Sequence, residues 1–225
     1  MARPTLVLFD VNETLSDLRP LRRRLAEAGA PGDLLDLWFA STLRDGIALT
    51  AAGGYADFRT VASSVLRGRL EQIETLHGDP ADAAEHVVSG FGDLDVHPDV
   101  EEGVRTLASA GVRLATLTNG SAEVARTLLE RAGLADLVER HLSVEAVRRW
   151  KPAAEPYLYA ARELAVPPAD CALAAVHPWD VDGAKRAGLR AAWLDRAGGR
   201  YPEFFEQPDW SGRTLGSLAD ALLAA

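Results

Sequence analysis

The sequence is poor in cysteine, long apolar runs and net positive charge. Cys171 is the single cysteine in 225 residues, so no disulfide can form within the chain, and a reducing cytoplasm is the expected location. No run approaches the roughly 18 apolar residues of a membrane-spanning helix. We also expect no signal peptide, because residues 1–4 lead directly into an apolar strand. The net charge of -9 disfavours nucleic acid as a partner, since binding phosphates requires a basic surface.

Short apolar runs predict a buried sheet. They lie at Thr5–Phe9, Val112–Thr118, Ala172–Val176 and Ala191–Leu194. Helical patterns follow the second and third runs, at residues 121–132 and 180–187, and each ends at a glycine. This alternation predicts an α/β fold, a Rossmann-like core with a mainly parallel sheet. Cys171 stands at the start of the third run, so we expect a buried and unreactive thiol.

A long segment without strand patterns separates the first two apolar runs. Apolar residues at helical spacing lie at residues 34–43 and again at 58–66, with turn signals at Gly53-Gly54 and at His77–Pro80. The sequence therefore predicts a core domain of residues 1–15 and 98–225, interrupted by a helical cap domain at 16–97. Because this insertion follows the first strand so closely, we expect it to serve as a lid.

Polar residues stand where the predicted strands end. The first strand leads to Asp10, the second to Thr118-Asn119, and the third to His177 and Asp180. In open α/β sheets, ligands bind beyond the carboxyl ends of the strands. These side chains therefore predict a site at one edge of the sheet.

Asp10 can serve as a nucleophile, as a metal ligand or as the N-cap of a following helix. Capping is common for aspartate. It is disfavoured here because Val11 and Asn12 do not begin a clear helix and because the other strand ends are also polar. A carboxylate nucleophile would form an ester that water must then cleave.

Lys151 and His177 are the other candidates for chemistry. Lys151 precedes Pro152, which predicts a loop residue at a helix start. An ammonium group near Asp10 would keep that carboxylate ionised. Asp180 can orient Lys151 or cap its own helix. His177 can accept a proton from the water that attacks the ester, with Glu13 holding the imidazole tautomer as in a catalytic triad.

Four motifs in order, "FDVNETL", "LTNGS", "RRWKP" and "HPWDVDGAKRAGL", resemble the haloacid dehalogenase superfamily, in particular its L-2-haloacid dehalogenase (type II) branch. The resemblance spans nearly the whole chain. It implies that Asp10 displaces halide from C2 of a 2-halocarboxylate with inversion, and that hydrolysis of the ester gives a 2-hydroxyalkanoate. It implies no cofactor and no metal. A homodimer is common in the family.

The resemblance also assigns residues to roles. Thr14 matches a hydroxyl that hydrogen-bonds the nucleophile, Lys151 the motif lysine and Asp180 its acidic partner. A second group would bind or surround the substrate: Val11 through its backbone N–H, Asn12, Thr118, Asn119, Tyr157 and Trp179. A subset of the family pairs a histidine at the position of His177 with the glutamate corresponding to Glu13.

One departure from the family pattern concerns the leaving halide. Many type II members bind it with an arginine of the cap, and that position falls near Leu49 here, with Arg44 one or two turns away.

Two other functions stay open. Mg²⁺-dependent phosphatases of the superfamily carry a second aspartate two residues after the nucleophile to protonate the leaving alcohol. Asn12 stands there, and an amide cannot act as an acid. Asp10, Asp180 and Asp182 can nevertheless be read as magnesium ligands. The third reading is a binding protein that has lost catalysis.

Overall fold

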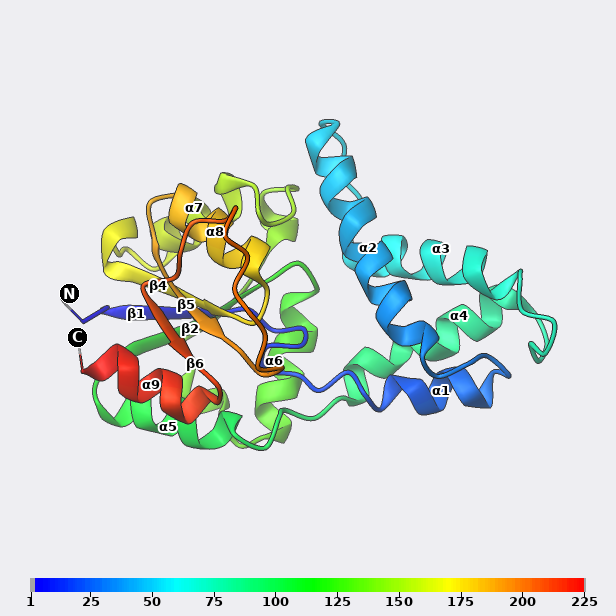
Figure 1. Cartoon of the computed structure of the whole chain (residues 1–225), viewed down its shortest axis with the longest axis horizontal. Coiled ribbons are helices and arrows are strands. Elements are labelled where there is room, and N and C mark those ends of the chain that lie inside the picture. Colours follow the sequence, from blue (N-terminus) through cyan, green and yellow to red (C-terminus); the bar gives the residue numbers. More distant parts are fainter. Residues whose placement is uncertain (1–2, 225) are drawn as a thin grey trace. The chain divides into compact units, whose positions relative to one another are not determined.

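The computed structural model describes residues 3–224, which form two compact units (Figure 1). The first unit contains the described residues up to Ser16 and those from Asp95 onward, and the second contains Asp17–Leu94. Between residues 3 and 224, no helix combines the length and the apolar character needed to cross a bilayer.

The first unit is built on a parallel sheet in which the spatial order is β3-β2-β1-β4-β5-β6. Its strands are β1 (Leu6–Phe9), β2 (Arg113–Thr118), β3 (Arg140–Ser143), β4 (Cys171–Ala175), β5 (Arg190–Leu194) and β6 (Trp210–Gly212). β1 pairs with β2 on one side and with β4 on the other. The strand order therefore reverses at β1, and its carboxyl end is the position where α/β sheets bind ligands.

The predicted α/β class and mainly parallel sheet are confirmed. The structure adds β3 and β6, which the apolar runs did not indicate. All four residues of β1 are buried, as a central strand covered on both faces requires. Cys171 begins β4 and is buried, and burial raises the pKa of its thiol to about 11, which suits the unreactive thiol expected from the sequence.

Helices cover both faces of this sheet (Figure 1). α5 (Val100–Ser109) and α9 (Leu215–Leu223) pack together on one face, and α7 (Ala154–Glu163) and α8 (Pro178–Arg186) pack on the other. α6 (Ala122–Arg131) connects β2 to β3. Two predicted helix starts need correction. α8 begins at Pro178 rather than Asp180, and α7 begins at Ala154, so Pro152 lies before the helix and follows Lys151 through a cis peptide bond.

The second unit consists of α1 (Leu21–Glu27), α2 (Leu34–Ala51), α3 (Phe58–Leu70) and α4 (Pro80–Ser89). Asp57 caps α3 by accepting the Thr60 N–H, and Asp79 caps α4. Its core is partly aromatic, and Trp38 donates from Nε1 to the Ala62 carbonyl at 2.9 Å. The role of this unit as a cap stays a prediction. A short 3-10 helix at Gly90–Asp93 belongs to this second unit, and three more, at Ala135–Leu137, Val144–Ala146 and Pro168–Asp170, belong to the first.

Two helical glycines allow a test of the packing between α5 and α9. A Cβ atom added to Gly103 in α5 would lie 2.7 Å from the backbone carbonyl oxygen of Leu215 in α9, whereas one added to Gly68 in α3 would meet nothing within 4 Å. We therefore expect Gly103→Ala to lower the free energy of unfolding by about 1–3 kcal/mol through overpacking. Gly68→Ala should raise it by about 0.5–1 kcal/mol through helix propensity. Urea unfolding of both variants checks this, and a stabilised Gly103→Ala would contradict the close packing.

Candidate active site

Asp10 directly follows β1 and is buried at the sheet's switch point. Its backbone N–H donates to the Ala174 carbonyl at 3.0 Å, which extends the pairing of β1 with β4 by one residue. No helix begins in the next ten residues, since α1 starts at Leu21. Capping is therefore not the role of Asp10, and its carboxylate is engaged by side chains instead.

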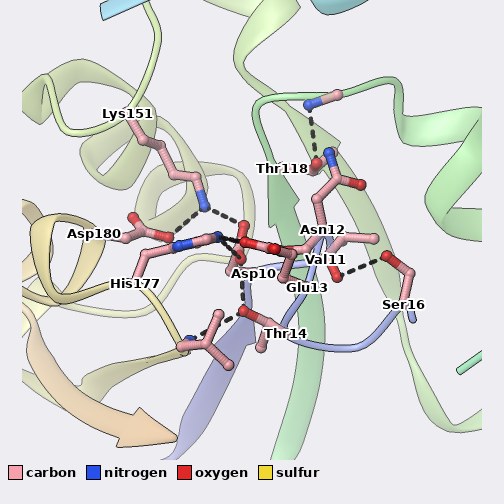
Figure 2. Close-up of polar contacts among 12 residues, drawn as sticks. Asp10, Val11, Asn12, Glu13, Thr14, Ser16, Thr118, Lys151, His177 and Asp180 are labelled. Carbon is pink, nitrogen blue, oxygen red and sulfur yellow. Dashed lines mark hydrogen bonds and ion pairs between the residues drawn. The ribbon is translucent and has the colours of Figure 1, made fainter. Parts of the chain in front are cut away.

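The loop after Asp10 turns back tightly and brings Thr14 to the carboxylate (Figure 2). The Leu15 and Ser16 N–H groups both donate to the Val11 carbonyl, and Glu13 takes a left-handed backbone conformation with φ 64°. The Thr14 hydroxyl donates to Asp10 Oδ2 at 2.6 Å. It also accepts the Val176 N–H at 3.1 Å, so its proton is directed at the carboxylate.

Lys151 lies between two carboxylates. Its Nζ is 2.8 Å from Asp10 Oδ1 and 2.6 Å from Asp180 Oδ2 (Figure 2). It also donates to the Leu117 carbonyl at 2.9 Å. The lysine is fully buried, and three acceptors match its three ammonium protons. Lys151 and Asp180 are thus brought to Asp10 as the sequence predicted.

The charges of this cluster change its pKa values. Burial alone would raise the pKa of Asp10, but the Lys151 ammonium, His177 and the hydrogen bonds from Lys151 and Thr14 outweigh it, so that pKa lies below its ordinary value. Burial would lower the pKa of Lys151, and the two carboxylates raise it instead. Burial raises the pKa of Asp180, and the attraction of Lys151 does not fully offset this. Asp10 is therefore an ionised carboxylate at neutral pH.

Tyr157, which the sequence predicted to lie beside the substrate, contacts Asp180; its place beside a substrate stays a prediction. It is fully buried, and its hydroxyl donates to Asp180 Oδ1 at 2.5 Å. Burial and the neighbouring Asp180 charge raise the pKa of this phenol well above its ordinary value, so it stays protonated. Tyr157 thus holds Asp180, which in turn holds Lys151.

Thr118 is the last residue of β2, which pairs with β1, and Asn119 follows it. The Thr118 hydroxyl accepts the Gly120 N–H at 2.9 Å, which leaves its own proton to donate. Asn119 Oδ1 accepts the Lys151 backbone N–H at 2.8 Å, and this contact defines the orientation of the amide. Asn119 is buried, and its Nδ2 has no hydrogen-bond partner among residues 3–224. A buried amide donor without a partner is costly, so this one is set up for a ligand acceptor.

Asn12 and Val11 complete the first loop. Val11 is buried, and a Cβ atom placed on Gly120 would lie 3.6 Å from Asn12 Nδ2 and 3.3 Å from Thr118 Oγ1. The Asn12 amide is therefore near the end of β2, on the same side of the loop as Thr118 (Figure 2).

His177 follows β4 and faces the first loop. Its Nε2 lies 3.8 Å from Asp10 Oδ2, 3.6 Å from Glu13 Oε2 and 3.3 Å from the Asn12 carbonyl oxygen. The ring stacks on Trp179, with centroids 5.0 Å apart. Glu13 and His177 are thus neighbours as predicted, but both carboxylates face the same ring nitrogen. A catalytic triad instead places its acid on the nitrogen opposite the one that transfers the proton.

The structure also shows where the residues considered for magnesium binding and for halide binding lie. Within residues 3–224, no three His, Cys, Asp or Glu side chains are grouped to hold a metal ion. Asp182 accepts hydrogen bonds from Arg186 and from the Glu206 N–H. Arg44 and Leu49 both lie in α2, where Arg44 pairs with the adjacent Asp45.

Comparison with known proteins agrees with this geometry. Residues 4–188 match the family model of haloacid dehalogenase-like hydrolases. The chain belongs to this family.

Individual haloacid dehalogenase-like hydrolases are similar over most of the chain. Haloacetate dehalogenase H-2 of Moraxella sp. (strain B) is 27% identical, and the match covers 94% of each protein. (S)-2-haloacid dehalogenase 1 of Pseudomonas sp. (strain CBS-3) is also 27% identical, over 84% of this chain and 83% of that protein. The solved structure of L-2-haloacid dehalogenase from Xanthobacter autotrophicus superposes with a TM-score of 0.86 at 26% identity, covering 96% of this chain and 97% of that one.

The sequence did not indicate one residue that supports the site of this haloacid dehalogenase-like hydrolase. Ser143, the last residue of β3, donates from its hydroxyl to the Gly120 carbonyl at 2.7 Å and so supports the turn that carries Asn119. β3 has the sequence RHLS, and three of its four residues are polar, so no apolar run marked it. Ser143 lies two strands after Asp10 along the chain, and nothing in its local sequence indicates this role.

Replacing Lys151 by methionine tests whether its ammonium keeps the carboxylates of Asp10 and Asp180 ionised. Removing one member of a buried ion pair should lower the free energy of unfolding near pH 7 by about 3–5 kcal/mol. With the ammonium gone, burial would raise the pKa values of Asp10 and Asp180 together, so both would take up protons on folding. The deficit relative to wild type should therefore shrink as the pH falls from about 7 to about 5.

Urea unfolding at both pH values measures the effect of Lys151→Met. Lys185→Met is the matched control, because Lys185 also pairs with an aspartate at 2.6 Å but is partly exposed. Its smaller loss should not change over this range. A deficit in Lys151→Met that does not depend on pH would contradict the charge balance.

Proposed function

We propose that this chain is a hydrolytic dehalogenase that converts L-2-haloalkanoates or haloacetates to 2-hydroxyalkanoates. The observation that carries the proposal is the state of Asp10, a buried carboxylate kept ionised by Lys151 and oriented by Thr14, with an amide at Asn12 in place of an acid. The similarity to haloacetate and (S)-2-haloacid dehalogenases over most of the chain supports the substrate class.

In the first step, a carboxylate oxygen of Asp10 attacks C2 of the substrate from the side opposite the halogen. The C2–halogen bond breaks, the halide leaves with the electron pair, and an aspartyl ester forms with inversion at C2. Halide is a stable anion, so no proton donor is required. Asn12 suits this reaction, whereas phosphoryl transfer to an alcohol would require an acid at its position.

The substrate carboxylate would bind at the ends of β1 and β2. The Asn119 Nδ2 donor has no partner among the described residues, and the Thr118 hydroxyl has a proton to donate. The Val11 backbone N–H would add a third donor. Hydrogen bonds to an ionised acceptor are stronger than neutral ones, so this set would select an anionic substrate.

In the second step, water attacks the carbonyl carbon of the Asp10 ester. The pair formed by Glu13 and His177 would take one proton from this water, because both groups lie within 4 Å of each other on the Asp10 side of the loop. The Lys151 ammonium would stabilise the oxyanion. Collapse of this intermediate breaks the bond between the Asp10 carbonyl carbon and the substrate oxygen, which takes up the proton from the base and leaves as the hydroxyl of the product. The second proton of the water passes from the Asp10 carboxyl group to solvent, which restores the ionised nucleophile.

Three further expectations stay predictions. We propose that the helical unit at Asp17–Leu94 acts as a cap, because it is inserted directly after the loop that carries Asp10 and Thr14. A homodimer and a cytoplasmic location, both expected from the sequence, also stay predictions.

Halide release tests the reaction. Wild-type protein should release halide from chloroacetate, fluoroacetate or 2-chloropropanoate without added metal, and should prefer the L-enantiomer of 2-chloropropanoate. Asp10→Asn should release none, because an amide is not a competent nucleophile. Asp170→Asn, which changes an exposed aspartate at the amino end of β4, should retain activity. No release by the wild type from any of these acids would refute the proposal.

Replacing His177 by alanine should separate the two steps. Ester formation should continue, while hydrolysis should slow by about 100-fold or more, the usual contribution of a general base. Mass spectrometry after mixing with substrate should then show protein carrying one acyl adduct at Asp10. Glu13→Gln should behave similarly, and His141→Ala, on β3, should not accumulate adduct. Normal turnover in His177→Ala would remove the histidine from the mechanism.

A further inference from the structure

Two side chains outside the predicted site hold the backbone of the nucleophile loop, residues 10–16. Arg196 Nη2 donates to the Thr14 carbonyl at 2.8 Å, and His97 Nε2 lies 3.0 Å from the Glu13 carbonyl. Arg196 comes from the loop after β5, and His97 precedes α5. Consecutive carbonyl groups of the loop are thus bound by residues more than 80 positions away in the sequence.

Arg196 is itself anchored by Asp99. Its Nη1 lies 2.7 Å from Asp99 Oδ1, and Asp99 Oδ2 accepts the Leu215 N–H at the start of α9, at 2.6 Å. Burial would raise the pKa of Asp99, but the Leu215 N–H and Arg196 outweigh it, so the pKa lies below its ordinary value and the carboxylate is ionised. The two side chains are only 20% and 17% exposed, so this pair is more rigid than a surface ion pair.

Thr14 connects this arrangement to the chemistry. The carbonyl that Arg196 binds belongs to the residue whose hydroxyl donates to Asp10 Oδ2. Thr14 is therefore held at both ends, by Arg196 at the carbonyl and by the Val176 N–H and Asp10 at the hydroxyl. The direction of the Asp10 carboxylate depends on the position of Thr14.

We propose that Arg196, anchored by Asp99, is a positioning residue that sets the attack geometry of Asp10 through the backbone of Thr14. This inference rests on the proposed dehalogenation for its kinetic consequence, but not for its structural one. It assigns Arg196 no contact with the substrate. Its contribution is to hold the nucleophile loop so that the Asp10 oxygen is aligned with C2.

Arg113 offers a matched comparison. Its Nη2 donates to the Leu164 carbonyl at 2.9 Å and pairs with Glu139 at 2.7 Å, so it also joins a carboxylate to a backbone carbonyl. It begins β2, at the amino edge of the sheet, whereas Asp10 follows the carboxyl end of β1. A variant of Arg113 therefore loses the same kind of bridge without affecting the nucleophile loop.

Arg196→Met should affect kcat far more than KM. Two of the three groups proposed to bind the substrate carboxylate, Thr118 and Asn119, lie on β2 and its following turn rather than on the nucleophile loop. The third, the Val11 N–H, lies in the loop, so KM should rise, but by less than kcat falls. Misplacement of a reacting group by about 1 Å can cost about 100-fold in rate, so a fall in kcat of about 10- to 100-fold is expected. Arg196→Lys, which keeps the charge but not the two-armed guanidinium, should recover part of the loss.

Hydrogen exchange supplies a readout that does not require activity. The Leu15 and Ser16 N–H groups are bonded to the Val11 carbonyl inside the nucleophile loop, so their exchange reports whether the loop opens. In Arg196→Met and Asp99→Asn, exchange of residues 10–17 should accelerate by about tenfold or more. In Arg113→Met it should match wild type, with kcat also unchanged.

The experiment combines both readouts on folded variants of the full chain, with thermal melts confirming folding. Faster loop exchange together with a kcat-selective loss supports the proposal. Unchanged exchange of residues 10–17 in Arg196→Met overturns it, as does an equal loss of kcat in Arg113→Met. If the wild type releases no halide, the dehalogenase proposal fails on that ground alone, and hydrogen exchange still decides whether Arg196 positions the loop.

Discussion

The buried ammonium of Lys151 is the interaction on which the site depends. Two carboxylates approach it, Asp10 from the end of β1 and Asp180 from α8, and neither could stay ionised in this buried position without a cation. The lysine supplies that cation and is itself kept charged by the carboxylates. A buried ion pair of this kind contributes little net stability. The ion pair instead keeps the proposed nucleophile, the Asp10 carboxylate, charged while it is shielded from water. This matters because hydration would weaken a carboxylate as a nucleophile.

The sheet topology explains why these groups can meet. β1 lies between β2 and β4, because the chain first places β2 and β3 on one side of β1 and then returns to place β4, β5 and β6 on the other. The ends of these three strands therefore deliver Asp10, Thr118-Asn119 and His177 to one place. Lys151 arrives from the β3–α7 connection, and its backbone N–H is held by Asn119. The Asn119 amide thus holds the Lys151 backbone with its oxygen, while its buried nitrogen has no hydrogen-bond partner among the described residues.

Support for the site extends beyond the groups that touch a substrate. Tyr157 holds Asp180, Ser143 holds the turn at Gly120, and Arg196 with Asp99 holds the loop at Thr14. These side chains come from different elements: Tyr157 from α7, Ser143 from the end of β3, and Arg196 from the loop after β5. Precise placement of a reacting group requires such neighbours, because a loop alone has too much conformational freedom.

The sequence by itself determined the α/β class, the strands β1, β2, β4 and β5, and the polar residues that end them, because apolar runs and their boundaries are local features. It also determined that Asn12 replaces an acid. Only the tertiary structure decided that β3 and β6 join the sheet, since RHLS and WSG are too polar or too short to be marked by an apolar run. It also decided that Tyr157 holds Asp180, that Glu13 and Asp10 share one nitrogen of His177, and that Arg196 reaches Thr14. These are contacts between residues far apart in the chain, and the packing that creates them leaves no periodic signal in any one segment.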